Sequence, residues 1–482
     1  MQFNSYVFIF LFLPVFVLVY YLFCKVSTEL GKAVIISASI LFYSWGRWNM
    51  LLYLAASIVF NYALAFLIYK MNSQSRTLLA FAAAVNILFL LFFKYLNFSI
   101  ENLDLLLGTH IGVKDIILPL GISFYTFQQI AYIVSVSKGM IEKPCLLDYL
   151  AYILYFPKLV MGPLAEPADL IAQFNDDSRK RANAAGLACG IKLFSLGLIK
   201  KVLFADTFSK AVSWIWGHPE TATSADCLLL ILFYTFEIYF DFSGYSDMAI
   251  GVSMMINIDL PMNFDSPYKA LSIRDFWKRW HISLTKFLTK YIYIPLGGSR
   301  KGAARTYINT IAVFLISGLW HGANWTFVLW GLLHGALSCM DRALDSFEKK
   351  VPRPVRWLLT FAAVNVLWLL FSAPSISQWG GMLCKALSLQ DMTVSGAVKG
   401  VFMLNEMTFI MDNLHLWRLY YLISGFEMWI MVITACVICF IPQNNYRNRT
   451  KLDWLSWVLT VLGLVWGVLC LGAESTFVYF GF

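Results

Sequence analysis

Apolar residues run along almost the whole chain in stretches long enough to cross or enter a lipid bilayer. A helix needs about 20 such residues to span the roughly 30 Å hydrocarbon core. The pattern therefore predicts an all-α, polytopic membrane protein with about 11–13 transmembrane or re-entrant helices in one membrane-embedded domain, residues 1–482. The runs centre on residues 6–23, 33–45, 49–69, 77–99, 115–137, 146–162, 185–204, 225–240, 306–340, 355–373, 421–441 and 453–471.

The run from Thr306 to Met340 is unusual because it contains no Asp, Glu, Lys or Arg over 35 residues, yet holds His321 near its middle. A helix of that length would measure about 50 Å, which exceeds the bilayer core. We expect it to bend or break at Gly318 and Gly322. Broken helix is tolerated in a membrane where it is buried in protein or lines a cavity. His321 is therefore predicted to face a cavity, and an ionisable residue there is a functional-site hypothesis.

Composition supports a membrane protein, since 59% of the residues are hydrophobic and 13% charged, against roughly 25% charged in soluble domains. The net charge of +9 comes largely from basic residues in short loops. This is typical of the positive-inside bias and predicts membrane lipids, not nucleic acid, as partners. The nine cysteines form no disulfide framework, and no metal-ligand pattern stands out.

Residues 272–288 place charges and aromatic residues at helical spacing. Ser272 is the expected N-cap, and Asp275 and Arg279 would share one helical face. The pattern predicts an amphipathic interfacial helix whose Lys278 reaches lipid phosphates, as would Lys286. Its buried stripe consists of Phe276, Trp280, Ser283, Leu284 and Phe287. The glycine-containing basic loop that follows, residues 291–300, is suited to an anionic headgroup or a nucleotide phosphate.

Seven strings of polar and aromatic residues, all of them between residues 118 and 335, are distinctive. They are Leu118–Gln128, Tyr155–Leu164, Asp241–Gly251, Asn263–Tyr268, Asp275–Leu284, Tyr293–Gly298 and Gly318–Gly322. Together they resemble the membrane-bound O-acyltransferase (MBOAT) family, and the first two resemble its bacterial alginate O-acetyltransferase branch. The resemblance implies helices around a tunnel that joins the two membrane faces.

The resemblance also implies that His321 is essential for acyl transfer and that His281 occupies the family's second recurrent histidine or asparagine position. One departure is Ser372, where the family pattern leads us to expect arginine. The other candidate substrate-binding residues lie in or beside the seven strings. They are Trp320, Asn324, Gln128, Asp275, Lys278, Arg279 and Tyr293.

Acyl transfer from a thioester to a hydroxyl needs a base, and neutral imidazole suits that task near neutral pH. His321 is the candidate base, with Trp320 and Trp325 as a wall against water; the alternative is a structural histidine that bonds a carbonyl freed by the helix break. His281 has a weaker case, because it could equally orient the donor, bond the acceptor or lie at the interface. On one ideal helix His334 would not share a face with His321.

Buried charges form a further group of candidates, namely Lys158, Glu237, Asp241 and Asp247. Ionisable residues inside a membrane need partners. They could line a polar tunnel, or they could pair with each other and with basic residues of the central segment. Both alternatives stay open at the level of sequence.

The favoured hypothesis is an acetyltransferase of the bacterial cytoplasmic (inner) membrane that carries no bound cofactor. It would move acetyl groups from cytoplasmic acetyl-CoA toward hydroxyls of an extracytoplasmic polysaccharide, together with a separate extracytoplasmic acetyltransferase or esterase-like partner. One alternative is D-alanyl transfer to teichoic acid from a carrier-protein thioester. A polysaccharide or lipid transporter or flippase is a second, because kinked helices and buried charges also occur there.

Overall fold

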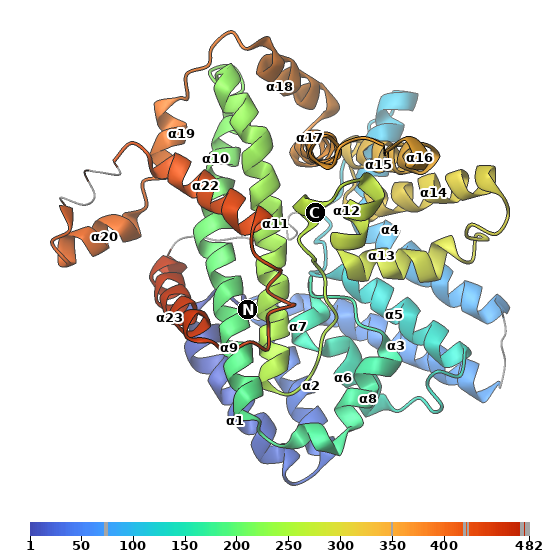
Figure 1. Ribbon diagram of the computed structural model, residues 1–482. Coiled ribbons are helices and arrows are strands. Elements are labelled where there is room, and N and C mark those ends of the chain that lie inside the picture. The colour runs from blue at the N-terminus through green and yellow to red at the C-terminus, as the bar shows by residue number, and fades with distance from the viewer. Residues whose placement is uncertain (72–75, 349, 418–420, 422–423, 473–476, 478–482) are drawn as a thin grey trace. The chain divides into compact units, whose positions relative to one another are not determined.

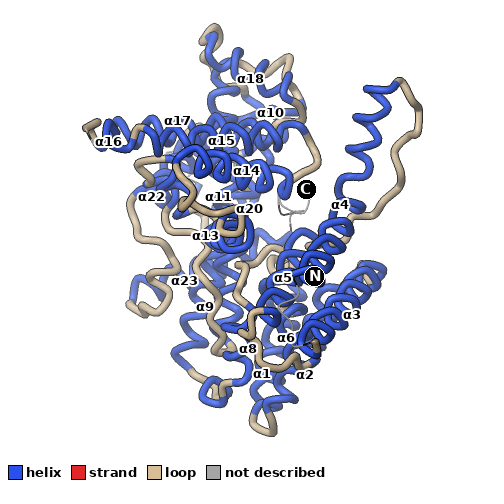
Figure 2. The backbone as a smooth tube through the Cα atoms, turned by 90° about the vertical axis from the view of Figure 1, so that its right-hand side faces the viewer, coloured by secondary structure: helices blue, strands red, loops and turns tan. Residues whose placement is uncertain are grey.

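The protein is described by a computed structural model that covers residues 1–482 except 72–75, 349, 418–420, 422–423, 473–476 and 478–482. Every regular element among the described residues is a helix, and loops connect them (Figures 1 and 2). The predicted all-α class is confirmed.

The first of two compact units comprises residues 1–194, 245–261 and 449–460. Its helices are η1 (Phe8–Phe12), α1 (Leu13–Cys24), α2 (Thr28–Ser44), α3 (Asn49–Lys70), α4 (Arg76–Leu107), α5 (Ile122–Ser137), α6 (Leu146–Leu154), α7 (Phe156–Leu159), α8 (Pro167–Asn175), η2 (Asp177–Lys180) and most of α9 (Ala184–Ile199).

The second unit comprises residues 195–244, 262–448 and 461–482 and contains both histidines of the predicted active site. Its helices are η3 (Lys200–Ala205), α10 (Asp206–Gly217), most of α11 (Ser224–Met255), η4 (Pro267–Lys269), α12 (Ile273–Arg279), α13 (Ile282–Leu288), η5 (Thr289–Tyr293), α14 (Ala303–His321), α15 (Trp325–Ala343), α16 (Asp345–Glu348), α17 (Arg353–Ser372), α18 (Ile376–Ser388), α19 (Gly396–Val401), α20 (Asn405–Asn413), α22 (Glu427–Phe440), part of α23 (Trp454–Leu469) and η6 (Cys470–Gly472). The single domain over residues 1–482 stays a prediction.

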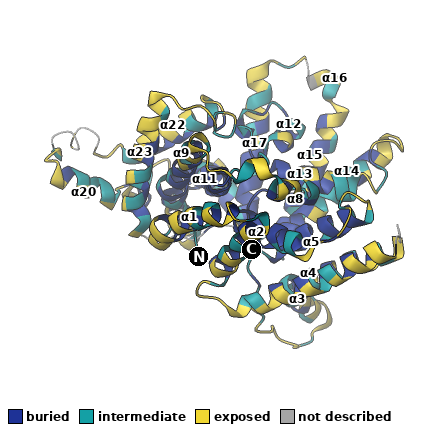
Figure 3. Cartoon of the chain, turned by 90° about the horizontal axis from the view of Figure 1, so that it is seen from below, coloured by how far each residue is buried: buried dark blue, intermediate teal, exposed yellow. Residues whose placement is uncertain are grey.

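Five helical segments among the described residues are long and apolar enough to cross a membrane, namely α3, α4, α11, α17 and residues 454–472. They differ in burial: 83% of the apolar window of α11 is buried but only 17% of that of α4, whose exposed residues are visible in Figure 3. An apolar surface of this kind suits contact with lipid. Because the criterion is length and composition alone, the number of passes and the central tunnel stay predictions.

The apolar run around His321 is broken where the sequence predicted. It forms two helices, α14 and α15, which lie side by side and antiparallel (Figure 1). Glycines allow the close approach: a Cβ on Gly318 would lie 2.2 Å from the carbonyl oxygen of Phe327, and one on Gly331 would lie 2.4 Å from that of Phe314. Small residues at such crossings let backbones pack closely in membrane helices.

The predicted interfacial helix over residues 272–288 is wrong in one respect, because it is two helices, α12 and α13. Ser272 is the N-cap, as predicted, and accepts a hydrogen bond from the Asp275 amide at 3.2 Å. The break falls at His281, whose φ of +43° places a non-glycine residue in the left-handed region. The predicted stripe is buried throughout, and Lys278 is exposed.

Candidate active site

His321 is the last residue of α14 and is 4% exposed. Its imidazole is enclosed by three aromatic rings, with centroid distances of 4.9 Å to Trp320, 5.3 Å to Trp330 and 5.1 Å to Phe371. Gly322 follows directly, and a Cβ there would lie 2.0 Å from the Phe327 ring. Because α14 ends at His321, the imidazole lies at a helix end inside an aromatic enclosure and not in the middle of a continuous helix.

Trp320 brings the two predicted catalytic histidines to one place. Its indole centroid lies 4.9 Å from that of His321 and 6.1 Å from that of His281. Trp320 is 4% exposed, so it can serve as the predicted wall. Trp325 is different, because it is 54% exposed. Trp330 and Phe371 provide the enclosure that was expected of Trp325.

His281 is held by Asn263, a residue to which the sequence assigned no role. The Nδ1 atom of His281 lies 3.1 Å from Oδ1 of Asn263, which also accepts from the Ser283 hydroxyl at 2.8 Å. Because an amide oxygen only accepts, Nδ1 of His281 carries the proton and Nε2 carries the lone pair. The Phe242 ring packs edge-on against the imidazole at 4.6 Å. Burial lowers the pKa of His281 well below its ordinary value, so the ring is neutral.

His334 enters the same region, which the sequence did not predict. It lies on α15, is 0% exposed, and its ring contacts Trp330 at 4.7 Å. Nδ1 of His334 accepts a hydrogen bond from Nε1 of Trp277 at 3.2 Å. The argument that His334 and His321 do not share a face assumed one helix and does not apply to a hairpin. Trp330 contacts both imidazoles.

Trp368 and Phe371 of α17 complete the enclosure, next to the position where the sequence departs from the family pattern. Trp368 packs on Trp330 at 5.9 Å and on Trp280 at 4.8 Å. Ser372, found where arginine was expected, bonds its own helix through the Leu369 carbonyl. Residues 368–371 therefore contribute rings to the site without that arginine.

A pocket of about 360 Å³ opens between α12, α13, α14 and α15. Three basic residues line it, Arg274, Lys278 and Arg342, and its lining contains no acidic residue. Two predicted substrate-binding residues, Lys278 and Tyr293, belong to it. Further lining residues connect it to the histidines: Trp277 bonds His334, Ser317 lies one turn before His321, and Ser338 lies one turn after His334.

The other predicted substrate-binding residues have structural partners. Asp275 and Arg279 form the expected i,i+4 ion pair at 2.9 Å. The Asn324 side chain caps α15 by accepting from the Thr326 amide at 3.0 Å. Gln128 belongs to the first unit, where its Oε1 accepts from Nζ of Lys158. Their roles toward a substrate stay predictions.

The buried charges mostly have partners close by. Lys201 of η3 contacts Asp241 at 2.6 Å and Asp206 at 2.8 Å, and both Lys201 and Asp241 are 1% exposed. Asp241 therefore pairs with Lys201, which lies before the central segment in the sequence. Lys158 is 0% exposed and lies over the Tyr152 ring at 3.9 Å.

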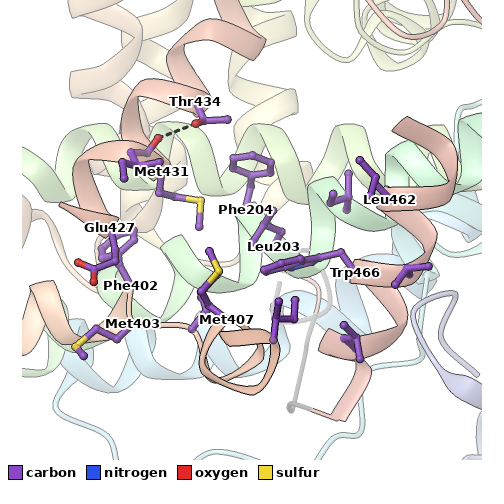
Figure 4. Close-up of a pocket in the computed structure, with 16 residues that line it drawn as sticks. Leu203, Phe204, Phe402, Met403, Met407, Glu427, Met431, Thr434, Leu462 and Trp466 are labelled. Atoms are coloured by element: carbon purple, nitrogen blue, oxygen red, sulfur yellow. Dashed lines mark hydrogen bonds between the residues drawn. The ribbon is translucent and has the colours of Figure 1, made fainter. Parts of the chain in front are cut away.

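A second pocket of about 430 Å³ in the second unit is apolar (Figure 4). Met407, Met431 and Trp466 line it, and its one ionisable residue is Glu427. Glu427 accepts a hydrogen bond from the Gly425 amide at 2.8 Å. The lining contains none of the three histidines His281, His321 and His334. We therefore place the chemistry in the aromatic enclosure.

A metal centre is not supported among the described residues. Within them, no three His, Cys, Asp or Glu side chains come together in a way that could hold an ion. The enclosure itself presents imidazoles and indole N–H groups.

Comparison with known proteins places the chain in a family. The sequence model of the membrane-bound O-acyltransferase (MBOAT) family matches residues 135–377. A peptidoglycan O-acetyltransferase of Helicobacter pylori is 35% identical, over 100% of this chain and 97% of its own length. A probable alginate O-acetylase AlgI of Azotobacter vinelandii is 39% identical, over 82% of this chain and 80% of its own length. A teichoic acid D-alanyltransferase of Streptococcus thermophilus is 25% identical, over 46% of this chain and 57% of its own length.

The chain belongs to the membrane-bound O-acyltransferase family. It is a membrane protein and an O-acyltransferase. This favours an enzyme over the transporter or flippase that the sequence left open.

Proposed function

We propose that this protein transfers acetyl groups from acetyl-CoA to hydroxyls of an extracytoplasmic polysaccharide, from the bacterial cytoplasmic membrane. Relatives named peptidoglycan O-acetyltransferase and alginate O-acetylase align over most of the chain. The relative named teichoic acid D-alanyltransferase aligns over about half of it at lower identity. Acetyl transfer is therefore favoured over D-alanyl transfer.

The observation that supports this function best is the aromatic enclosure of His321. A neutral imidazole can accept the proton of an attacking hydroxyl. Three rings around a residue that is 4% exposed limit the access of water, which would otherwise hydrolyse the thioester. In this proposal His321 is the general base, and His281, held by Asn263, helps to orient a substrate.

The basic pocket between α12 and α15 is the proposed entrance for the donor. Coenzyme A carries phosphates, and Lys278 and Arg342 are exposed cations at this pocket. We expect Lys278→Ala to raise KM for acetyl-CoA several-fold and to leave kcat near the wild-type value, because a phosphate contact stabilises ground state and transition state alike. The effect should shrink in high salt. Lys286→Ala, an exposed lysine outside the pocket lining, is the matched control.

The proposed partner is a separate extracytoplasmic acetyltransferase or esterase-like protein that completes the transfer. The assay should therefore use membrane vesicles of the native bacterium. In that strain the chromosomal gene for this protein is deleted, and a plasmid supplies the wild-type or variant gene. Labelled acetyl-CoA is supplied together with alginate oligosaccharides or peptidoglycan fragments.

Wild-type vesicles should label an acceptor, and His321→Ala vesicles with the same amount of folded protein should not. Unchanged transfer by His321→Ala would mean that His321 is structural. Labelling only from a D-alanyl carrier-protein thioester would replace acetyl transfer by D-alanyl transfer.

A further inference from the structure

Among the buried N–H groups of the aromatic enclosure, Nε1 of Trp330 and Nε2 of His334 have no acceptor among the described residues, and neither does Nε1 of Trp368. Trp330 and His334 are both 0% exposed. Buried donors are nearly always paired in proteins, because an unpaired one loses its hydration without compensation. Such groups at the centre of a site therefore need an explanation.

The tautomer of His334 is determined by its neighbour. Trp277 can only donate through Nε1, and it donates to Nδ1 of His334 at 3.2 Å. Nδ1 is therefore the acceptor, and the proton of the neutral ring is on Nε2. His334 thus presents a fixed N–H donor at Nε2. Its imidazole is surrounded by the aromatic rings of Trp277, Trp330 and Phe314.

The Trp330 donor lies beside His321, and the His334 donor lies beside Trp330. The indole of Trp330 contacts the His321 ring at 5.3 Å and the His334 ring at 4.7 Å. The two imidazole centroids are therefore no more than about 10 Å apart. A base with one N–H donor next to it, and a second donor in contact with the first, suits acyl transfer, because negative charge develops on the carbonyl oxygen.

The same face of α15 connects these donors to the basic pocket. Trp330, His334 and Ser338 follow one another at intervals of four residues, a spacing that keeps side chains on one helical face. The Ser338 hydroxyl is also buried without a described partner, and Ser338 lines the pocket. A thioester arm that enters through the pocket would meet these polar groups in sequence.

We propose that Trp330 and His334 are catalytic residues whose Nε1–H and Nε2–H groups bind the oxyanion formed on the thioester carbonyl. The proposal rests on the proposed function. In the step, His321 takes the proton of the acceptor hydroxyl while the hydroxyl oxygen forms a bond to the carbonyl carbon of the thioester. The carbonyl electron pair moves to oxygen, which accepts both hydrogen bonds. The C=O bond then re-forms, the C–S bond breaks, and the thiolate takes the proton from His321.

The first test is Trp330→Phe, which keeps an aromatic ring and removes the N–H. Loss of one oxyanion donor should lower kcat about 10²-fold or more, with KM for acetyl-CoA little changed. Trp357→Phe is the matched control, because its Nε1 donates to the Tyr268 carbonyl at 2.9 Å and so has a structural partner. We expect it to lower the thermal unfolding midpoint but to keep kcat. A folded Trp330→Phe protein with kcat within threefold of wild type would overturn the proposal.

The second test uses His334, in case Trp330→Phe does not fold. Glutamine has both an acceptor for Trp277 and an N–H donor, whereas leucine has neither. His334→Gln should therefore keep more activity than His334→Leu, and the loss should again be in kcat. Equal kcat values for the two variants, with both proteins folded, would contradict an oxyanion role.

These outcomes are separable from those of the proposed function. Wild-type vesicles that transfer no acetyl group from acetyl-CoA would refute acetyl transfer. The oxyanion role would then be measured with the D-alanyl carrier-protein thioester, since every thioester passes through the same charged intermediate. The pH profile of the Trp330→Phe variant should match that of wild type, because neither donor titrates in the step.

Discussion

Replacement of Asn263 by alanine keeps the His281 imidazole in the protein but removes the hydrogen-bond acceptor that orients it. The substitution therefore tests whether the orientation of His281 matters for transfer. Asn263 is 1% exposed, and its Oδ1 accepts from His281 Nδ1 at 3.1 Å, from the Ser283 hydroxyl at 2.8 Å and from the Ser283 amide at 3.3 Å. Alanine removes the acceptor that these donors share. The imidazole then loses the contact that fixes its tautomer and its orientation.

The magnitude follows from the two side-chain donors. Each buried donor that loses its partner costs about 1–3 kcal/mol, so for two donors we expect the free energy of unfolding to fall by about 2–6 kcal/mol. If His281 orients a substrate, a displacement of about 1 Å in its ring should lower kcat by about 10²-fold. Stability is measured by unfolding in mixed micelles, and kcat by transfer from acetyl-CoA in vesicles.

Asn365→Ala is the matched control, because it removes another buried asparagine of the second unit, whose side-chain amide donates to the Phe361 carbonyl of its own helix. Its Oδ1 accepts from the Thr235 hydroxyl at 2.7 Å. We expect a loss of stability of the same order with normal kcat. A wild-type kcat in folded Asn263→Ala protein would refute the reasoning that His281 must be oriented for transfer.

Two further predictions concern packing and charge. Gly331→Ala should lower the free energy of unfolding by about 1–3 kcal/mol, because its Cβ would lie 2.4 Å from the Phe314 carbonyl oxygen. The control Gly381→Ala, in open space on α18, should raise the free energy of unfolding by about 0.5–1 kcal/mol. Equal effects of the two substitutions would refute the close packing of α14 and α15 at Gly331. The Arg447 guanidinium holds the pKa of Asp265 below its usual range, so this pair stabilises the fold above the unfolded-state pKa and loses that effect as pH falls through the folded-state pKa. Arg447→Ala should therefore be less stable than wild type at pH 7 and equal to it at acid pH, as thermal unfolding across pH will show; a constant difference would contradict the linkage.

Local rules predicted those features of the site that depend on neighbours in the sequence. The length of the apolar run and the glycines near His321 predicted the break after α14, because a bilayer limits helix length. The polar residue Ser272 predicted the start of α12, and the four-residue spacing of Asp275 and Arg279 predicted their ion pair. The helix start and the ion pair are each determined within one or two helical turns, and the break within one apolar run.

Features that depend on tertiary contacts were not predicted. No glycine or proline marks the break at His281, where a left-handed conformation coincides with a hydrogen bond to Asn263, eighteen positions earlier in the sequence. His334 was dismissed because its angle to His321 was taken along one ideal helix. Once α14 and α15 pair as a hairpin, Trp330 contacts both rings. A stricter use of the predicted break would have found this pair.

His281 and His334 differ in what their Nε2 atoms offer, and this difference determines on which side of the enclosure each substrate binds. His281 donates a hydrogen bond from Nδ1 to Asn263, so its Nε2 is an acceptor. His334 accepts a hydrogen bond at Nδ1 from Trp277, so its Nε2 is a donor. A carbonyl oxygen needs donors, and a hydroxyl about to lose its proton needs acceptors. If the thioester carbonyl lies against Trp330 and His334, the hydroxyl must therefore approach His321 from the side of Trp320 and His281. Substitution of His281 should then weaken binding of the polysaccharide more than that of acetyl-CoA, whereas an equal effect on both would place the two substrates on the same side.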